Sequence, residues 1–287
     1  MSYTLRELQL CELEVLKSIK SICDKHQIRY YLSSGTLLGA VRHQGFIPWD
    51  DDIDVEMPYP DYLRFLEVAQ AELGEDFFLQ NYDTDPYYYF AYSRVRKNGT
   101  TMMREWEKDI PSHYGVWVDI FPMAYVGGTL DYRFKRLLLS CRTFLRMHED
   151  LFSLSQEWLV SQSSAFMVML VKLARLLPES VRYKICKAIE KYIFRRREKA
   201  YLSNVWVNIT RRIPKESFEP ATELLFEGER FSAPKDYDTY LRIAYGDYMT
   251  PPPEGKRGGG HGDLHVDLHH SWKPGEELPE VLKENII

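Results

Sequence analysis

Aspartates crowd the segment WDDDIDV at residues 49–55, where four of five consecutive positions carry a carboxylate. On a strand over residues 52–57 the side chains alternate between faces, so Asp52 and Asp54 are expected to point the same way while their apolar neighbours face the core. Two carboxylates about 7 Å apart along one face can converge on one or two divalent cations. Because all the ligand atoms are oxygens, Mg²⁺ or Mn²⁺ suits this pattern better than zinc.

A run of aspartates by itself is also typical of a solvated surface loop, so the residues around it have to decide. Upstream, SSGT at residues 33–36 joins a predicted strand to a predicted helix. Backbone N–H groups at such a helix N-terminus bind phosphate, so Ser34, Gly35 and Thr36 are predicted to contact a phosphate group. A phosphate-binding turn followed by metal-binding carboxylates is what transfer from a nucleoside diphosphate or triphosphate requires.

A third carboxylate, Asp119 in VWVDIFP, stands alone in an apolar segment that has the pattern of a strand. An isolated aspartate is costly to bury without a partner, so Asp119 is the predicted third catalytic and metal-binding carboxylate. The alternative is an aspartate at a strand end that accepts hydrogen bonds from backbone N–H groups. Asp50 and Asp51 fit the alternating pattern less well, and we assign them either to orienting the loop or to contacting the metal ligands rather than the metal itself.

The order of predicted elements indicates a protein of both helices and strands, α/β in the broad sense. Its arrangement is expected to be α+β, with a mixed sheet. A helix is predicted at 4–26, and strands and helices alternate up to about residue 127. A hairpin is predicted at LLFEGERF, with its turn at Glu227 and Gly228. Three segments between these parts have helical periodicity: 131–150, 157–176 and 179–200. We expect three regions: a catalytic core at 1–127, a helical subdomain at 128–205, and at 206–287 a return segment that packs on the core and ends in a ligand-covering tail.

The composition is that of an ordinary globular protein. The chain has 287 residues, 45% hydrophobic and 28% charged, and 37 basic against 42 acidic side chains give a net charge of −5. That balance disfavours nucleic acid as a partner. The four cysteines are scattered without CxxC spacing, which favours free thiols over a disulfide framework or a zinc site. The first residues lack the pattern of a signal peptide and no apolar run is long enough to cross a bilayer, so we expect a cytoplasmic protein.

The segment RYYLSSGTLLGAVRHQGFIPWDDDIDVEMPYPDYLRFL closely resembles the signature of the LicD family of phosphotransferases, a branch of the nucleotidyltransferase-fold superfamily. Gly35 and Thr36 match the first part of the superfamily pattern, and Asp52 and Asp54 match its Asp-hydrophobic-Asp part. VDIFPMA and FEGERFSAPKDYDTYLRIAYGDYMTPPPEGKR also look like this family. LicD-like sequences commonly read SGGT where this chain reads SSGT at residues 33–36. The difference is Ser34, which stands in place of the first glycine.

The resemblance implies a nucleotidyltransferase-type core that transfers phosphocholine from CDP-choline to a hydroxyl of a cell-surface glycan or its lipid-linked precursor. Fukutin-like relatives transfer ribitol phosphate from CDP-ribitol, and this alternative stays open. The carried-over roles are Asp52 and Asp54 as ligands of Mg²⁺ or Mn²⁺ and Asp119 as the third carboxylate. Asp119 could also be the base that accepts the proton of the glycan hydroxyl.

Basic residues near these motifs have both a functional and a structural interpretation. Arg42 ends the helix after SSGT, where it either contacts the diphosphate or pairs with Asp50 and Asp51. Lys256 and Arg257 lie in a glycine-rich tail that either folds over a ligand phosphate or stays a solvated loop.

Two other segments allow more than one interpretation. The basic segment 182–199 is either a helix that makes peripheral contact with an anionic membrane or a solvated helix packed on the domain. HGDLHVDLHH has metal-ligand spacing if it is extended, but an exposed edge strand shows the same pattern. Its ligand candidates are His261, Asp263, His265, Asp267 and His269.

Two rival functions are weighed against phosphotransfer. A glycosyltransferase with an Asp-x-Asp motif normally builds about a hundred residues of nucleotide-binding fold before that motif, which here comes much earlier. A catalytically dead metal- or glycan-binding module is disfavoured by the three carboxylates and the Gly-Thr turn. Choline itself requires an aromatic cage for its quaternary ammonium group. The candidates for this cage are Tyr87, Tyr88, Tyr89, Trp106, Trp117 and Tyr245.

Overall fold

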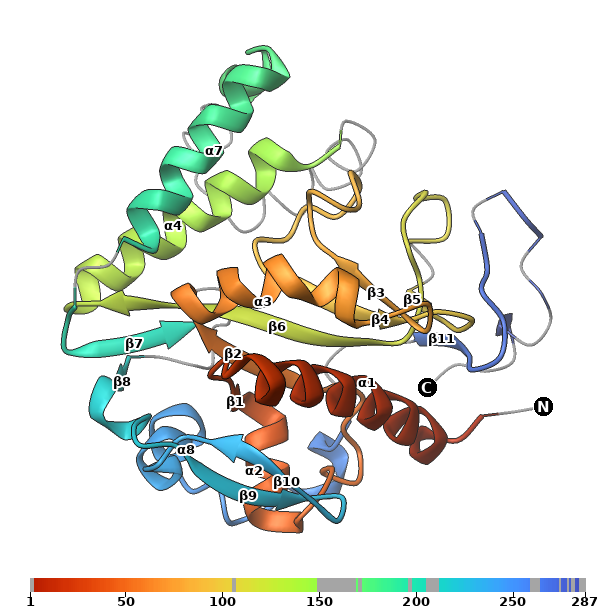
Figure 1. Ribbon diagram of the computed structural model, residues 1–287, viewed down its shortest axis with the longest axis vertical. Coiled ribbons are helices and arrows are strands. Elements are labelled where there is room, and N and C mark those ends of the chain that lie inside the picture. Colours follow the sequence, from red (N-terminus) through yellow and green to blue (C-terminus); the bar gives the residue numbers. More distant parts are fainter. Residues whose placement is uncertain are drawn as a thin grey trace.

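A mixed sheet forms the centre of the computed structural model (Figure 1). The structure describes residues 3–104, 107–148, 169, 172–195, 198–204, 212–258, 264–273, 275–277, 279 and 282–283. Within them the sheet has the strand order β1-β2-β6-β4-β3, and β7 and β8 extend it from β6. Its strands are β1 (Tyr31–Leu32), β2 (Asp54–Pro58), β3 (Phe77–Gln80), β4 (Ser93–Lys97), β6 (Trp117–Val126), β7 (Tyr201–Asn204) and β8 (Ile213–Pro214).

Helices and two small sheets surround this central sheet. The helices are α1 (Leu5–His26), α2 (Ser34–His43), α3 (Tyr59–Glu72), α4 (Thr129–Arg146), α7 (Glu179–Ile193) and α8 (Tyr237–Tyr245), with 3-10 turns η2 (Lys215–Ser217) and η3 (Glu254–Lys256). The small sheets pair β9 (Thr222–Phe226) with β10 (Glu229–Ala233) and β5 (Thr101–Arg104) with β11 (Leu264–Asp267).

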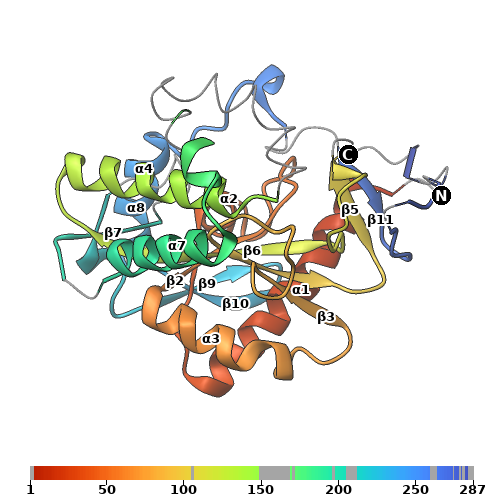
Figure 2. The same cartoon turned by 90° about the horizontal axis from the view of Figure 1, so that it is seen from above.

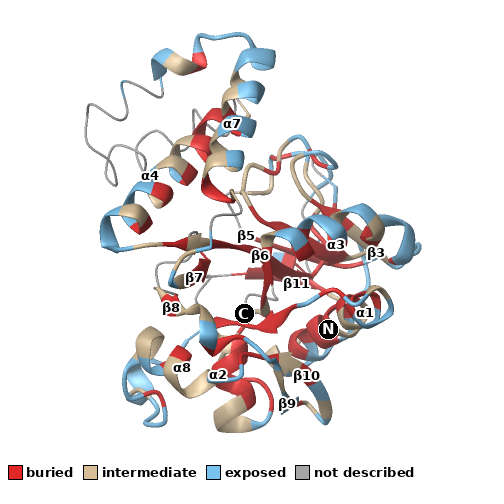
Figure 3. Cartoon of the chain, turned by 60° about the vertical axis from the view of Figure 1, so that its left-hand side comes forward, coloured by how far each residue is buried: buried red, intermediate tan, exposed pale blue. Residues whose placement is uncertain are grey.

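Strand β6 is the central strand of the large sheet. It pairs in parallel with β2 and antiparallel with β4 and β7, so the predicted mixed α+β sheet is confirmed. Nearly all of its residues are buried, as expected for a strand that is covered on both faces (Figure 3).

Helices α1 and α3 contact each other and both pack against β6, at the bottom of Figure 2. Helix α1 begins with a capping box, in which the Thr4 hydroxyl accepts the Glu7 N–H and the Glu7 carboxylate accepts the Thr4 N–H. Leu8, Leu16 and Ile19 lie on its buried face at helical spacing and are fully buried. The predicted helix at 4–26 is therefore confirmed, and its apolar side faces the sheet.

Helices α2 and α8 and strands β9 and β10 lie together in the lower part of Figure 1. Helix α2 contacts β2, β9 and α8. The predicted hairpin is confirmed as β9–β10, and both turn residues, Glu227 and Gly228, have positive φ angles of 52° and 82°. These values match the type I′ turns that two-residue hairpin loops prefer.

Helices α4 and α7 pack along each other and project from the sheet at the top of Figure 1. They correspond to the predicted helices at 131–150 and 179–200 but end earlier, at Arg146 and Ile193. The predicted helix at 157–176 lies mostly outside the described residues, and the division into three regions stays a prediction. In the described part of the chain, every helix is too short or too polar to span a membrane.

Candidate active site

Three aspartates gather on the loop between α2 and β2. Ligand oxygens of Asp50, Asp51 and Asp52 all lie within 4.8 Å of one another, which is close enough to hold a metal ion. Among the described carboxylates, histidines and cysteines, this is the group of three that is so compact. The predicted strand start at residue 52 is wrong, because β2 begins at Asp54. The neighbouring β1 is only two residues long and pairs with Val55 and Glu56, so the residues before Asp54 leave the sheet. Asp52 is therefore part of the loop, and its carboxylate lies close to those of Asp50 and Asp51.

The other two predicted carboxylates lie in one row across the sheet. Asp54 is the register partner of Asp119 on β6, and Asp119 is the register partner of Arg94 on β4. Side chains of such partners share a face of the sheet. Burial, followed by the charges of Asp52 and Asp119, raises the pKa of Asp54 well above its ordinary value. Asp54 and Asp119 are thus adjacent on the sheet, and the charge of the loop acts on Asp54, but they are not members of the compact group formed by the three loop aspartates.

Asp119 is bound to a buried guanidinium rather than to backbone N–H groups alone. The Arg94 Nε donates to Asp119 Oδ1 at 2.6 Å, and these two side chains are 4% and 5% exposed. The guanidinium lies 4.3 Å from the centroid of the Trp117 ring. Arg94 is therefore a fixed cation beside the acidic site, although the sequence offered no sign of which carboxylate it would meet.

The SSGT turn contacts both the loop and the first residue of β2. Ser34 has a φ of +47°, in the left-handed region that favours glycine, which explains why glycine is common at this position in LicD-like sequences. A Cβ on Gly35 would lie only 2.6 Å from Asp50 Oδ2, so only glycine fits there without moving Asp50. The Thr36 hydroxyl accepts the Asp54 N–H at 2.9 Å. The predicted phosphate-binding turn therefore lies next to the carboxylates.

A buried tyrosine, Tyr240 of α8, ties this turn to β2. Its hydroxyl lies 3.1 Å from Ser33 Oγ, accepts the Ser34 N–H at 3.4 Å and donates to Glu56 Oε1 at 3.3 Å. Burial raises the pKa of Glu56 to about 7, and hydrogen bonds from Ser33, Tyr240 and Asn204 oppose the rise. No sequence pattern pointed to Tyr240, because its contact spans 206 residues.

The basic residues of the tail lie beside the acidic loop. The Arg257 guanidinium stacks over Trp49 at 4.8 Å, and its Nε donates to the carbonyl oxygen of Pro252. The Arg42 Nη1 donates to the carbonyl oxygen of Tyr248 at 2.7 Å. Burial and the Arg257 charge lower the pKa of Arg42, while the Asp50 charge opposes this. Arg42 and Arg257 are thus near each other, and Lys256 is exposed in η3.

The predicted aromatic cage is divided between two places. Tyr88 and Trp117 surround the Arg94 guanidinium together with Phe90 and Tyr92, so the cation among these rings is one of the chain's own. The Tyr87 ring contacts His148 and the Tyr89 ring contacts Phe90, both in tilted arrangements, while Trp106 lies outside the described residues.

Tyr245 is the member of the predicted aromatic set on which the charges of Asp54 and the loop aspartates act. Burial, followed by the charges of Asp54, Asp50 and Asp52, raises its pKa. It stands at the last position of α8, the helix that also carries Tyr240.

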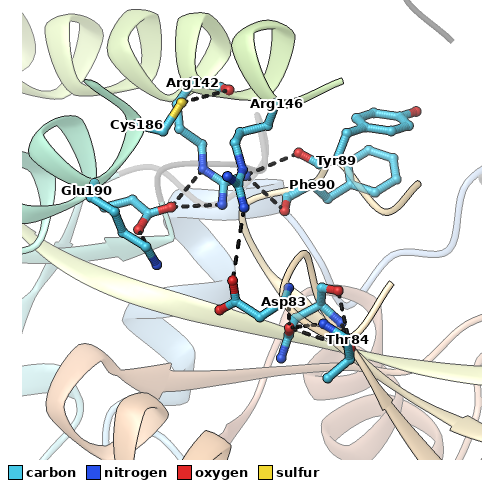
Figure 4. Close-up of polar contacts among 10 residues, drawn as sticks. Asp83, Thr84, Tyr89, Phe90, Arg142, Arg146, Cys186 and Glu190 are labelled. Atoms are coloured by element: carbon cyan, nitrogen blue, oxygen red, sulfur yellow. Dashed lines mark hydrogen bonds and ion pairs between the residues drawn. The ribbon is translucent and has the colours of Figure 1, made fainter. Parts of the chain in front are cut away.

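The helical pair supports the aromatic segment that precedes β4 (Figure 4). The Arg142 Nη1 of α4 donates to the carbonyl oxygens of Tyr89 and Phe90, at 3.1 Å in each case. The Glu190 carboxylate of α7 accepts from Arg142 at 2.7 and 2.8 Å. Helices α4 and α7 thereby fix the backbone of the segment whose rings surround Arg94.

The histidine-rich tail has structural contacts in its described part. Strand β11 pairs with β5, and His265 Nδ1 lies 2.6 Å from the carbonyl oxygen of Leu282. Asp267 accepts the backbone N–H of His269 and binds the His270 ring. His261 and Asp263 lie outside the described residues, so the proposed metal site of this tail stays a prediction.

A mixed sheet that presents carboxylates beside a glycine-containing strand–helix turn is the architecture of a nucleotidyltransferase domain. Residues 27–156 match the family described as LicD/FKTN/FKRP, nucleotidyltransferase domain. The lipopolysaccharide cholinephosphotransferase LicD of Haemophilus influenzae is 30% identical over 257 residues, which cover 88% of this chain and 93% of that protein. The chain therefore belongs to the LicD family.

Shorter matches point in the same direction. Human ribitol 5-phosphate transferase FKRP is 34% identical over 61 residues, which are 21% of this chain and 12% of that protein. An uncharacterized protein of Rickettsia typhi is 44% identical over 55 residues, 19% of this chain and 18% of its own length.

Proposed function

We propose that this protein transfers phosphocholine from CDP-choline to a hydroxyl of a cell-surface glycan, such as a lipopolysaccharide, teichoic acid or capsule-type polymer, or to a lipid-linked precursor. The observation that carries the proposal is the similarity to a lipopolysaccharide cholinephosphotransferase along 88% of the chain. The family match at 27–156 includes the SSGT turn, the acidic loop and Asp119. Membership of this family favours phosphotransfer over the alternative of a nucleotide-sugar glycosyltransferase.

The acidic site fits a divalent metal ion. Its donor atoms are all carboxylate oxygens, the ligands that Mg²⁺ and Mn²⁺ prefer. Asp52, Asp54 and Asp119 are the proposed ligands, and Asp50 and Asp51, whose oxygens lie within 4.8 Å of those of Asp52, are close enough to Asp52 to share in binding. When bound there, the metal supplies positive charge that offsets the charge of the diphosphate.

The chain's own residues hold the donor and acceptor in the proposed reaction. The acceptor hydroxyl oxygen bonds to the phosphorus of phosphocholine, the bond between that phosphorus and the bridging oxygen breaks, and CMP leaves with the bonding electrons. Backbone N–H groups of Ser34, Gly35 and Thr36 would bind a phosphate oxygen, with Arg42, Lys256 and Arg257 on the open side. Asp119 is the proposed acceptor of the hydroxyl proton, and Arg94 fixes its orientation.

A second donor is favoured by one specific observation. The segment that matches ribitol 5-phosphate transferase FKRP covers 61 residues, so a CDP-alcohol such as CDP-ribitol is the alternative donor. The two donors differ at the alcohol and share CMP as product. Tyr245, on which the charges of Asp54 and the loop aspartates act, is the aromatic residue best placed to contact a quaternary ammonium group.

We also propose peripheral contact with the cytoplasmic face of a membrane through the basic segment 182–199. In the described part of this segment, Ile193 and Phe194 are buried in a cluster with residues of β6 and α4, and Lys184, Lys187 and Lys191 are exposed. The contact would therefore be electrostatic and not apolar insertion. Charge reversal of the three lysines should abolish co-sedimentation with anionic vesicles, and unchanged co-sedimentation would contradict the idea.

The test of function is CMP release from a panel of CDP-alcohols: choline, ethanolamine, ribitol and glycerol. We expect release from CDP-choline with Mg²⁺, loss of release with EDTA, and loss in the Asp52→Asn, Asp54→Asn double variant. Slow hydrolysis by water is sufficient, so no acceptor has to be chosen. Release from CDP-ribitol alone would establish the alternative donor. No turnover of any donor, with glycan binding retained, would favour the binding-module alternative.

A further inference from the structure

Glu12 is a buried glutamate, and the described residues around it offer its carboxylate no hydrogen-bond donor. It lies on α1 with 0% exposure, and neither of its carboxylate oxygens has a hydrogen-bond partner. Leu8 and Leu16, one turn before and after it, are fully buried apolar residues on the same face of the helix. A leucine would fill this position without placing a charge in the core.

The acidic site lies directly beside Glu12. Gln9, three residues earlier on the same face of α1, donates to the carbonyl oxygens of Asp50 at 2.9 Å and Ile47 at 3.4 Å, so α1 is docked on the acidic loop. After burial itself, the charges that raise the pKa of Glu12 are, in order, those of Asp52, Asp51, Asp50 and Asp119. The charges that act most strongly on this buried carboxylate are thus all carboxylates.

Such an arrangement is unfavourable without a cation. A buried carboxylate needs hydrogen-bond donors or a counter-charge, and here the adjoining groups carry the same charge. Of the cations near the site, Arg94 is engaged by Asp119, and Arg42 and Arg257 donate to the carbonyl oxygens of Tyr248 and Pro252. Two observations therefore point to the same place: three aspartates within 4.8 Å of one another, and a fully buried, unpartnered glutamate one turn from the Gln9 contact with their loop.

We propose that Glu12 is a further ligand of the divalent cation at Asp50, Asp51 and Asp52, bound directly or through one water molecule. The inference rests on the proposed function, because that function supplies the cation. Glu12 lies on the inner side of the site, on a helix that packs against β6 and β4. Cation binding then joins α1 to the acidic loop and relieves repulsion among the carboxylates.

The test compares Glu12→Gln with Glu14→Gln. Glu14 lies on the same helix, is 58% exposed and pairs with Lys97, so its replacement makes the same change of charge away from the site. Titration calorimetry with Mn²⁺ should show affinity at least about tenfold weaker for Glu12→Gln and within about twofold of wild type for Glu14→Gln. Melting in EDTA gives a second readout. The amide that Glu12→Gln introduces can donate to the surrounding carboxylates, so we expect this variant to melt about 2 °C or more above wild type.

Each result decides between the inference and the function on which it rests. Mn²⁺ affinity of Glu12→Gln equal to that of wild type would overturn the role of Glu12 and leave the proposed function standing. Lower stability of Glu12→Gln than of wild type in EDTA would also overturn it, because the carboxylate would then be satisfied within the protein. Wild-type protein that takes up no Mn²⁺, with or without CDP-choline, would overturn both the cation site and the role of Glu12.

Discussion

Arg94 is the buried counter-charge of Asp119, and removing it should be costly. The two side chains are 4% and 5% exposed, and 2.6 Å separates Arg94 Nε from Asp119 Oδ1. We expect Arg94→Met to lower the free energy of unfolding by about 3–5 kcal/mol, because it leaves a charged carboxylate buried without its partner. Coulomb's law gives a similar figure, since unit charges about 4 Å apart interact by about 4 kcal/mol at an effective dielectric constant of about 20.

Equilibrium unfolding in urea with EDTA present measures this loss for wild type, Arg94→Met, Asp119→Asn and the double variant. Asp119→Asn leaves the guanidinium without its carboxylate, so it is also destabilising. The double variant removes both charges. We expect its loss in free energy of unfolding to be smaller than the sum of the two single losses by at least about 2 kcal/mol. Losses that add to within about 0.5 kcal/mol would refute the reasoning, because the two side chains would then not be coupled.

Two further changes test the geometry of the site, and a third tests the effect of a partly buried histidine on stability. Ser34→Gly should raise the free energy of unfolding in urea by about 0.5–1 kcal/mol, because it relieves a left-handed backbone conformation; a loss would contradict this. Gly35→Ala should weaken Mg²⁺ binding in calorimetry about tenfold by displacing Asp50, and unchanged affinity would refute that placement. Burial, then the Arg96 charge, lowers the pKa of His113 to about 4 from an ordinary 6.5, so the unfolded chain takes up this proton first as pH falls. We expect about 1–2 kcal/mol of stability to be lost between about pH 7 and pH 5, a loss that His113→Gln should remove in urea unfolding.

Local patterns predicted most of the elements around the site. The helix at 4–26 was predicted from the spacing of its apolar residues, and the hairpin from the Glu227-Gly228 turn. The structure adds the Thr4 capping box, which the prediction did not use. The start of β2 was predicted two residues early, because alternation of Asp and apolar residues continues into a loop that has no strand partner.

Contacts between distant segments could not be predicted in the same way. Glu12 interrupts the apolar face of α1, and this irregularity is the one signal that could have identified it. Arg94 has no such signal, because its partner depends on the register of β4 with β6. The same is true of Tyr240, which reaches Ser33 and Glu56 only in the folded chain.

The most direct test of the cation site is a crystal structure of the protein with Mn²⁺ and CDP-choline, recorded at the manganese absorption edge. Anomalous scattering locates the ion independently of any assumed ligand. We expect a peak among the carboxylates of Asp50, Asp51, Asp52, Asp54 and Asp119, with ligand oxygens within about 2.5 Å of the ion. A nucleotide bound without manganese at this site, or a manganese peak found only around His265 and Asp267, would contradict the proposal that these aspartates hold the catalytic cation.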